Sequence, residues 1–296
     1  MPSSTAQANG HAATIPAQTA GRASDEDTAS HSNGEPKKPF KPQLPLTSWA
    51  DTRQNTAAIA FILGCVFTVG LTNGLSLFWS SNNQVSLLHV QQLSSRERFW
   101  NAITGPRLGA YIAFQAVFHM MEFFTTAIYN PDKASPKSFL LDDKNHMAAH
   151  AFAAVEYLLE ETYLPAKWLA YKHSSLLAII GLTLVTLGQI LRSTAMITAA
   201  SNFSHLIQYS KAAEHTLVRT GIYAWSRHPS YFAFFYWALG TQIFVGNPVA
   251  FLAFFFILYR FFSGRIQVEE WYLIKFFGQD YVKYQKEVPS RIPFIP

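Results

Sequence analysis

The chain alternates long apolar blocks with short polar segments, after an N-terminal stretch that is polar throughout. Residues 57–79, 108–129 and 174–199 form three blocks that are each long enough to cross a bilayer as a helix. Residues 147–159 form a shorter block that contains an acidic residue, Glu156. This pattern predicts membrane-spanning helices connected by polar segments.

The last two apolar blocks lie close together. Residues 231–245 and 249–262 are each shorter than the roughly 20 residues that span a bilayer upright. Gly246, Asn247 and Pro248 separate them, and residues of these types favour a turn. We therefore expect a helical hairpin that enters and leaves the membrane on one side. The fold predicted is an all-α integral membrane protein with about six transmembrane segments, including this C-terminal hairpin.

The N-terminal stretch, residues 1–48, is rich in Ser, Ala, Thr, Pro and Gly. Such a segment buries too little apolar surface to fold, so we expect it to be disordered. It lacks the apolar core of a secretory signal peptide. The first apolar block is therefore expected to act as an uncleaved signal anchor.

Charge and composition support the membrane interpretation. Only 14% of the 296 residues are charged, against about 25% in ordinary soluble domains, while 49% are hydrophobic. The net charge of +5 could indicate nucleic-acid binding. However, the Lys and Arg residues are scattered between apolar blocks and form no basic stripe, so we expect a lipid bilayer as the partner and no nucleic acid.

Six spans would place the basic residues before the first block, before the hairpin and after it on one side. The positive-inside rule makes that side the cytosol, with both termini there, although Arg96, Arg98 and Arg107 in an opposite loop run counter to it. The single cysteine, Cys65, excludes a disulfide framework and a zinc–cysteine site. Since it lies inside an apolar run, we expect it to be a buried, unreactive thiol.

Polar and ionisable residues gather at both ends of the hairpin. Residues 227–231 (RHPSY) open it, Arg260 lies near its end, and Arg265, Glu269 and Glu270 follow it. Charge at a membrane boundary is costly and is more often functional than decorative. Pro229 suits the first turn of a helix, whose free N–H groups can receive a carboxylate. The alternatives are interfacial anchoring, a plain salt bridge between Arg265 and Glu269, and an ordinary loop over residues 200–227.

A second polar group lies further upstream. His146 and His150 are four residues apart, and His119 and Glu122 occupy a neighbouring block. A di-iron membrane hydroxylase would need several such histidine pairs, and the chain offers no second one. We therefore expect a structural histidine pair and no metal. The absence of any Gly-x-Gly pair also excludes the glycine-rich dinucleotide fingerprint and the matching loop of soluble methyltransferases.

The C-terminal third resembles the isoprenylcysteine carboxyl methyltransferases of the endoplasmic reticulum membrane. The residues that carry the resemblance are 215–218 (HTLV), 220–223 (TGIY), 227–231 (RHPSY), 240–242 (GTQ), 247–248 (NP), 260–262 (RFF), 265–270 (RIQVEE), 276–278 (FFG), 281–284 (YVKY) and 288–295 (VPSRIPFI). Weaker similarity covers 149–160, 188–192 (GQILR) and 203–205 (FSH). Ala233 departs from the family pattern, which often has Gly there.

The resemblance implies an endoplasmic reticulum enzyme that uses S-adenosylmethionine to methylate prenylated CaaX proteins such as small GTPases. It places the cofactor pocket on the cytosolic side. Arg265 is the implied ligand of the substrate carboxylate, and Glu270 is implied to lie near the reacting centre. The implied cofactor-binding residues are Gln208, His215, Thr216, Leu217, Val218, Tyr223, His228, Pro229, Ser230, Tyr231 and Glu269. The chain would then comprise the tail (1–48), N-terminal transmembrane helices (49–199) and a C-terminal catalytic region (200–296).

The chemistry of this reaction fits such residues. A substrate carboxylate is already ionised at neutral pH, so no general base is required. Catalysis then depends on positioning the carboxylate in line with the methyl group and on removing water from it. Arg265 can grip the carboxylate with two hydrogen bonds, and Glu269 can hold the amino group of the cofactor.

Two other classes of function remain open from the residues. A membrane lipid methyltransferase or a sterol-reductase-like enzyme could have a similar helical architecture. A phospholipid amine would call for acidic acceptor-site groups rather than Arg265, and a reductase would need a further basic cluster. A non-enzymatic prenyl-lipid-binding protein would not need this concentration of polar groups.

Overall fold

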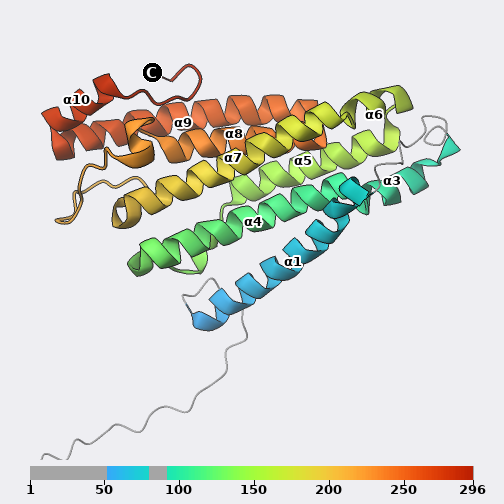
Figure 1. The fold of residues 1–296 in the computed structure, drawn as a ribbon, viewed down its shortest axis with the longest axis horizontal. Helices are drawn as coiled ribbons and strands as arrows, with labels where there is room; N and C mark the ends of the chain where they lie inside the picture. Colours follow the sequence, from blue (N-terminus) through green and yellow to red (C-terminus); the bar gives the residue numbers. More distant parts are fainter. Residues whose placement is uncertain (1–51, 80–91, 296) are drawn as a thin grey trace, which may run out of the picture. The chain divides into compact units, whose positions relative to one another are not determined.

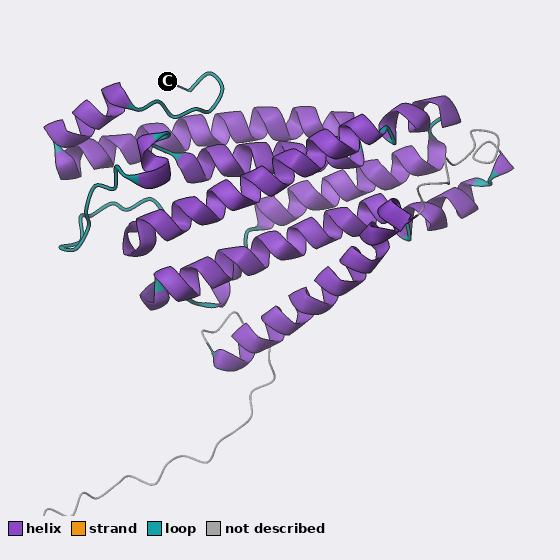
Figure 2. Cartoon of the chain, viewed as in Figure 1, coloured by secondary structure: helices purple, strands orange, loops and turns teal. Residues whose placement is uncertain are grey.

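The computed structural model describes residues 52–79 and 92–295, all within one structural unit, Leu44–Pro296. The described residues are helical or irregular, with no strand among them (Figure 2). The predicted disordered tail lies outside the described residues. Within the described residues, six helices of 17 residues or more run alongside one another (Figure 1): α1 (Arg53–Trp79), α4 (Pro106–Tyr129), α5 (Lys144–Tyr163), α7 (Ser175–Ala199), α8 (Pro229–Val245) and α9 (Pro248–Phe277).

Shorter elements occupy the two ends of this bundle. At one end lie α3 (Ser95–Ile103) and α6 (Ala166–Lys172), together with the turn between α8 and α9 (Figure 1). At the opposite end lie α10 (Gln279–Glu287) and four 3-10 turns, η1 (Pro131–Lys133), η2 (Pro136–Phe139), η3 (Ala200–Asn202) and η4 (Gly221–Ala224). We call this second end the site end, because the polar residues of the C-terminal third gather there.

Three helices meet the length and composition expected of a membrane span: Arg53–Leu75, Ala166–Asn202 and Pro248–Phe277. The other three long helices lie parallel to them but are shorter or carry more polar residues; α8, for example, has 17 residues. The structure thus shows an all-helical protein with apolar spans, while the count of six spans stays a prediction.

Helices α7 and α8 are in backbone contact along their length. A methyl group added at Gly181 of α7 would lie 2.5 Å from the backbone nitrogen of Phe244, and one at Gly240 of α8 would lie 2.7 Å from Cβ of Leu184. Small residues at such positions let membrane helices pack closely where there is no hydrophobic drive between them. These two contacts hold the end of α8 against the start of α7. Nearer the site end, a methyl group at Gly188 would lie 2.9 Å from the Ala233 carbonyl oxygen, so the close packing continues toward the start of α8.

The predicted hairpin is present, and an acidic side chain holds its turn. Helix α8 ends at Gly246, which has a left-handed backbone conformation, and α9 begins at Pro248. The Glu156 carboxylate of α5 accepts hydrogen bonds from the backbone N–H groups of Val249 (2.8 Å) and Ala250 (2.6 Å). These N–H groups have no partner within α9, and a carboxylate there also offsets the positive helix end.

Two features differ from the sequence-based expectations. Helix α9 continues beyond the apolar block that ends at residue 262 and reaches Phe277, so the polar residues Arg265, Glu269 and Glu270 extend the same helix. Helix α9 ends at Gly278, which has a positive φ of 56°. The prediction of a buried Cys65 is wrong, because this side chain is exposed on α1. A lipid-facing position is as apolar in sequence as a core position, which explains the error.

The cap on α9 can be tested with Glu156→Gln. Losing the charge and one acceptor leaves a buried N–H poorly satisfied, which costs about 1–3 kcal/mol. We expect a lower thermal unfolding midpoint of the purified protein in nanodiscs. Asp142→Asn, at an exposed position without a hydrogen-bonded partner among the described residues, is the control. Equal midpoints for the two variants would contradict the cap.

Candidate active site

A pocket opens at the site end of the bundle. Its walls are formed by the end of α7, by the segment 202–231, by the last turns of α9, and by α10. The lining residues are Ala199, Asn202, Phe203, Ser204, His215, Thr216, Leu217, Val218, Tyr223, Arg227, His228, Pro229, Ser230, Tyr231, Glu269, Leu273, Phe277, Tyr281 and Tyr284. All the residues predicted to bind the cofactor line it except Gln208, whose amide instead donates to the Ser204 hydroxyl at 2.7 Å.

The segment that forms one wall has little regular structure and is held by hydrogen bonds. The Asn202 side-chain oxygen accepts the backbone N–H of Thr216 at 2.8 Å. The Tyr284 hydroxyl of α10 donates to the Tyr223 carbonyl at 2.6 Å. Gly221 has a positive φ of 58°, which a glycine tolerates without strain. These contacts place the contiguous sequence motifs around one cavity.

The first turn of α8 forms the opposite wall. His228 precedes the helix, and Pro229 occupies its first position, as the sequence predicts. The turn contributes Pro229, Ser230 and Tyr231 to the pocket lining. The start of a helix carries a partial positive charge and N–H groups without helical partners, so it favours an anionic ligand.

Glu270 lies outside the pocket and binds the residues that precede the first turn of α8. It accepts hydrogen bonds from Arg227 Nε (2.5 Å), His228 Nε2 (2.9 Å), Gln285 Nε2 (2.7 Å) and the Tyr281 hydroxyl (3.3 Å). Glu270 itself does not line the pocket, whereas Arg227, His228 and Tyr281 do. Its carboxylate therefore connects α9, α10 and the residues that start α8.

The neighbouring acid, Glu269, faces the pocket and is connected to Arg265 through a tyrosine. The Tyr231 hydroxyl donates to Glu269 Oε2 at 2.5 Å and accepts from Arg265 Nε at 2.8 Å. Arg265 Nη2 donates to the His205 carbonyl at 2.6 Å. No direct ion pair between Arg265 and Glu269 occurs in the described structure, although the two are four residues apart on α9. Arg265 lies beside the pocket rather than in its lining.

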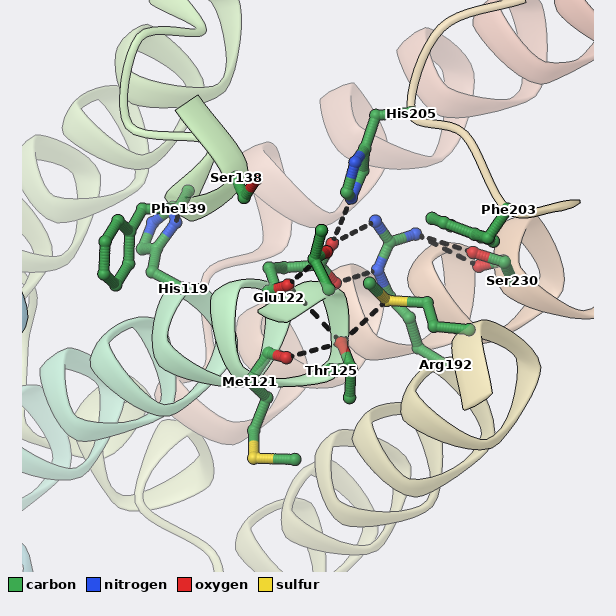
Figure 3. Close-up of polar contacts among 12 residues, drawn as sticks. His119, Met121, Glu122, Thr125, Ser138, Phe139, Arg192, Phe203, His205 and Ser230 are labelled. Atoms are coloured by element: carbon green, nitrogen blue, oxygen red, sulfur yellow. Dashed lines mark hydrogen bonds and ion pairs between the residues drawn. The ribbon is translucent and has the colours of Figure 1, made fainter. Parts of the chain in front are cut away.

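A buried hydrogen-bond network between helices, which the sequence analysis did not predict, supports the pocket from within the bundle (Figure 3). Arg192 of α7 donates to both carboxylate oxygens of Glu122 on α4, through Nε to Oε1 and through Nη2 to Oε2 at 2.9 Å. Its Nη1 donates to the Ser230 hydroxyl at 3.0 Å. His205 Nε2 lies 2.8 Å from Glu122 Oε2. The network thus joins α4, α7, the first turn of α8 and the pocket segment.

The sequence does contain an indication that Glu122 and Arg192 could pair, because each is a charged residue inside an apolar block. Charged groups inside membrane helices generally face one another, because an unpaired charge in lipid is very costly. Glu122 and Arg192 are 70 residues apart, so their pairing follows from the bundle and not from spacing.

The upstream histidines form a buried aromatic cluster. The rings of His146 and His150 lie 4.4 Å apart, and those of His119 and His146 lie 5.2 Å apart. His119 Nδ1 contacts the Phe139 carbonyl at 2.7 Å (Figure 3), and His150 Nδ1 contacts the Tyr111 hydroxyl at 2.6 Å. In the described ranges, no group of three or more His, Cys, Asp or Glu residues is arranged to hold a metal ion.

His215 is a titratable residue of the pocket lining that lies outside the apolar helices. Burial lowers the pKa of His215, and the nearby positive charges of Lys133 and Lys211 lower it further, while Glu269 acts in the opposite direction. Its ring contacts Phe276 and Phe277 edge-on. Burial and the nearby lysines thus favour the neutral form of the imidazole.

Comparison with known proteins gives a family match over a part of the chain that includes most of the pocket residues. The isoprenylcysteine carboxyl methyltransferase (ICMT) family matches residues 179–275, from α7 through most of α9. A Saccharomyces cerevisiae protein-S-isoprenylcysteine O-methyltransferase is 47% identical over 188 residues, covering 62% of this chain and 79% of that protein. A Xenopus laevis enzyme of the same name is 38% identical over 269 residues, covering 85% of this chain and 89% of that protein.

A solved structure of the same family also matches this chain. It is described as the eukaryotic intramembrane Ras methyltransferase ICMT, and it matches with a TM-score of 0.68 at 36% identity. The match covers 82% of this chain and 77% of that one. The chain belongs to the isoprenylcysteine carboxyl methyltransferase family.

Proposed function

We propose that the site-end pocket binds S-adenosylmethionine and that the enzyme uses it to methylate the C-terminal carboxylate of a prenylated cysteine. The chain is a membrane enzyme of a family whose relatives are protein-S-isoprenylcysteine O-methyltransferases. The observation that carries the cofactor proposal is the pocket itself. It combines a helix start, a carboxylate and aromatic rings at the end of an apolar bundle.

The pocket residues match the polar groups of this cofactor. Glu269 would hold its ammonium group, and the first turn of α8, with Ser230, would hold its carboxylate. His215 to Val218 and Tyr223 line the remaining wall, where a backbone segment and a ring suit a nucleoside. When bound, the cofactor supplies an electrophilic methyl group on a sulfonium.

The residues around the substrate carboxylate act by position and charge. The carboxylate is ionised well below neutral pH, so no side chain needs to remove a proton. Arg265 would bind it, and this guanidinium lies within hydrogen-bonding distance of the pocket residue Tyr231. Glu270 acts through its bonds to Arg227 and His228, which hold the first turn of α8 in place. The apolar bundle excludes water and accommodates the prenyl group.

The alternatives raised by the sequence are less well supported. A phospholipid methyltransferase would need acids at the acceptor position, for which we propose Arg265. The relatives named above are prenylcysteine methyltransferases, not sterol reductases or lipid-binding proteins. We therefore retain carboxyl methylation as the function.

The placement in the membrane is part of the proposal. Six long helices alternate in direction, so the start of α1 and the segment after α9 lie at the same end of the bundle (Figure 1). We propose six spans in the endoplasmic reticulum membrane, with both termini and the pocket on the cytosolic side. Prenylated CaaX proteins such as small GTPases are the proposed substrates. Residues 200–296 form the proposed catalytic region, preceded by membrane helices (49–199) and the tail (1–48).

The role of Arg265 is tested by methyl transfer from radiolabelled S-adenosylmethionine to N-acetyl-S-farnesylcysteine in purified membranes. We expect wild type to form a base-labile methyl ester. Arg265→Ala should lose about 10- to 150-fold in kcat/KM, because a hydrogen bond to a charged group contributes about 1.5–3 kcal/mol. Lys275→Ala, at an exposed position of the same helix outside the pocket lining, is the control and should keep wild-type turnover. Ester formation by Arg265→Ala at the wild-type rate would refute the assignment.

The neutral state of His215 predicts a pH dependence of cofactor binding. Because the pKa of His215 lies below the ordinary value of about 6.5, acidification should protonate the ring and add a positive charge to the lining of a pocket that would hold a cationic cofactor. We expect KM for S-adenosylmethionine to rise as pH falls from 7 to 5.5, and His215→Gln to flatten that rise. The substrate carboxylate stays ionised over this range. The same profile in both proteins would rule out His215 as the titrating group.

A further inference from the structure

The Tyr231 hydroxyl occupies the junction between the two proposed ligand positions. It touches Glu269, which would hold the cofactor ammonium, at 2.5 Å, and Arg265, which would hold the substrate carboxylate, at 2.8 Å. Both partners lie on α9, whereas Tyr231 belongs to the first turn of α8. The two arms of the hairpin are thus connected through one oxygen atom.

The ring of Tyr231 is held so firmly that its hydroxyl oxygen has a fixed position. It is stacked on His228 with ring centroids 5.4 Å apart, and on Phe262 with centroids 5.0 Å apart. The Arg265 guanidinium lies 5.4 Å above the same ring. Because a hydroxyl has a single hydrogen, it can donate to one acceptor at a time. What can change is the direction in which that hydrogen points.

In the present structure the hydrogen points to Glu269, because Arg265 can only donate. Arg265 is also partly occupied, since its Nη2 donates to the His205 carbonyl. A carboxylate arriving beside Arg265 would therefore face the lone pairs of the Tyr231 oxygen and not its hydrogen. This arrangement disfavours an anion at Arg265 for as long as Glu269 keeps the hydroxyl hydrogen.

We propose that Tyr231 couples the two sites by switching its hydrogen-bond acceptor from Glu269 to the substrate carboxylate when a cofactor ammonium occupies Glu269. The ammonium provides Glu269 with a stronger donor, and the hydroxyl then turns toward the carboxylate beside Arg265. The carboxylate gains Tyr231 as a second ligand. No proton is transferred, and no bond other than hydrogen bonds is made or broken. This inference rests on the proposed function.

The coupling must be reciprocal, because it is a free energy shared between two binding events. Couplings of this kind typically change affinity 5- to 150-fold. The cofactor should thus tighten substrate binding by at least about fivefold, and the substrate should tighten cofactor binding equally. S-adenosylhomocysteine is the suitable probe, because it has the ammonium group but transfers no methyl group.

The test measures the dissociation constant of N-acetyl-S-farnesylcysteine for the full chain in nanodiscs, with and without saturating S-adenosylhomocysteine. In wild type we expect a ratio of at least about five. In Tyr231→Phe, which keeps the ring and removes the hydroxyl, we expect a ratio near one. Tyr236→Phe should keep the wild-type ratio, because its hydroxyl on the same helix has no hydrogen bond within the described residues. Thermal unfolding of each variant shows whether the fold is retained.

A second ligand tests whether the coupling depends on the negative charge of the substrate carboxylate. The carboxamide of N-acetyl-S-farnesylcysteine keeps the lipid but lacks the anion, so the coupling ratio should fall toward one even in wild type. A wild-type ratio near one for the acid, or an undiminished ratio in Tyr231→Phe, would overturn the inference. Methyl ester formation by wild type separates this from the proposed function. If ester forms and the coupling persists in Tyr231→Phe, only the role of the Tyr231 hydroxyl in the coupling is wrong, whereas absence of ester refutes the proposed function itself.

Discussion

The first turn of α8 is held by two buried carboxylates, and the geometry of the pocket depends on this restraint. Glu270 binds Arg227 and His228 just before the turn, and Glu122 binds Arg192, which in turn binds Ser230. Neither carboxylate could be buried alone, because an ion without its partner in an apolar bundle costs several kcal/mol. Each pairing therefore fixes two helices at once, and together they set the position of the helix start that faces the pocket.

The position of the pocket at the end of the bundle suits the two proposed ligands. A prenyl group needs an apolar environment, whereas a nucleoside cofactor and a carboxylate need polar ligands. The ends of α7, α8 and α9 provide both, since their apolar lengths continue into the polar segment 202–231 and the last turns of α9. At the opposite end Glu156 caps α9 and fixes the hairpin turn. The hairpin is thus held at its turn by Glu156 of α5, and at its open end by Glu270 of α9 itself and by Glu122 of α4 through Arg192.

Local features of this structure could be predicted from the sequence, and long-range ones could not. The hairpin turn at Gly246–Pro248, the helix start at Pro229 and the break at Gly278 follow from residue types that act on their own backbone. Most of the pocket residues were found because they lie in contiguous motifs. The family resemblance, not periodicity, assigned their roles.

The remaining features depend on contacts between helices. Glu156 meets Val249 across 93 residues, and Glu122 meets Arg192 across 70, so neither spacing carries a local signal. The exposure of Cys65 was missed because lipid-facing and core positions are equally apolar. The Tyr231 bridge between Arg265 and Glu269 replaced the simple salt bridge that their spacing allows, because a ring from another helix lies between them.

The restraint on α8 is tested most directly by measuring S-adenosylhomocysteine binding to Glu270→Gln beside wild type, with thermal unfolding of both proteins in nanodiscs. Glu270 does not line the pocket, so any effect on the ligand must come through the pocket residues that it binds, Arg227, His228 and Tyr281. The account predicts at least about a tenfold loss of affinity in a protein that still unfolds cooperatively, equivalent to about 1.4 kcal/mol. Wild-type affinity in a folded Glu270→Gln protein would contradict it.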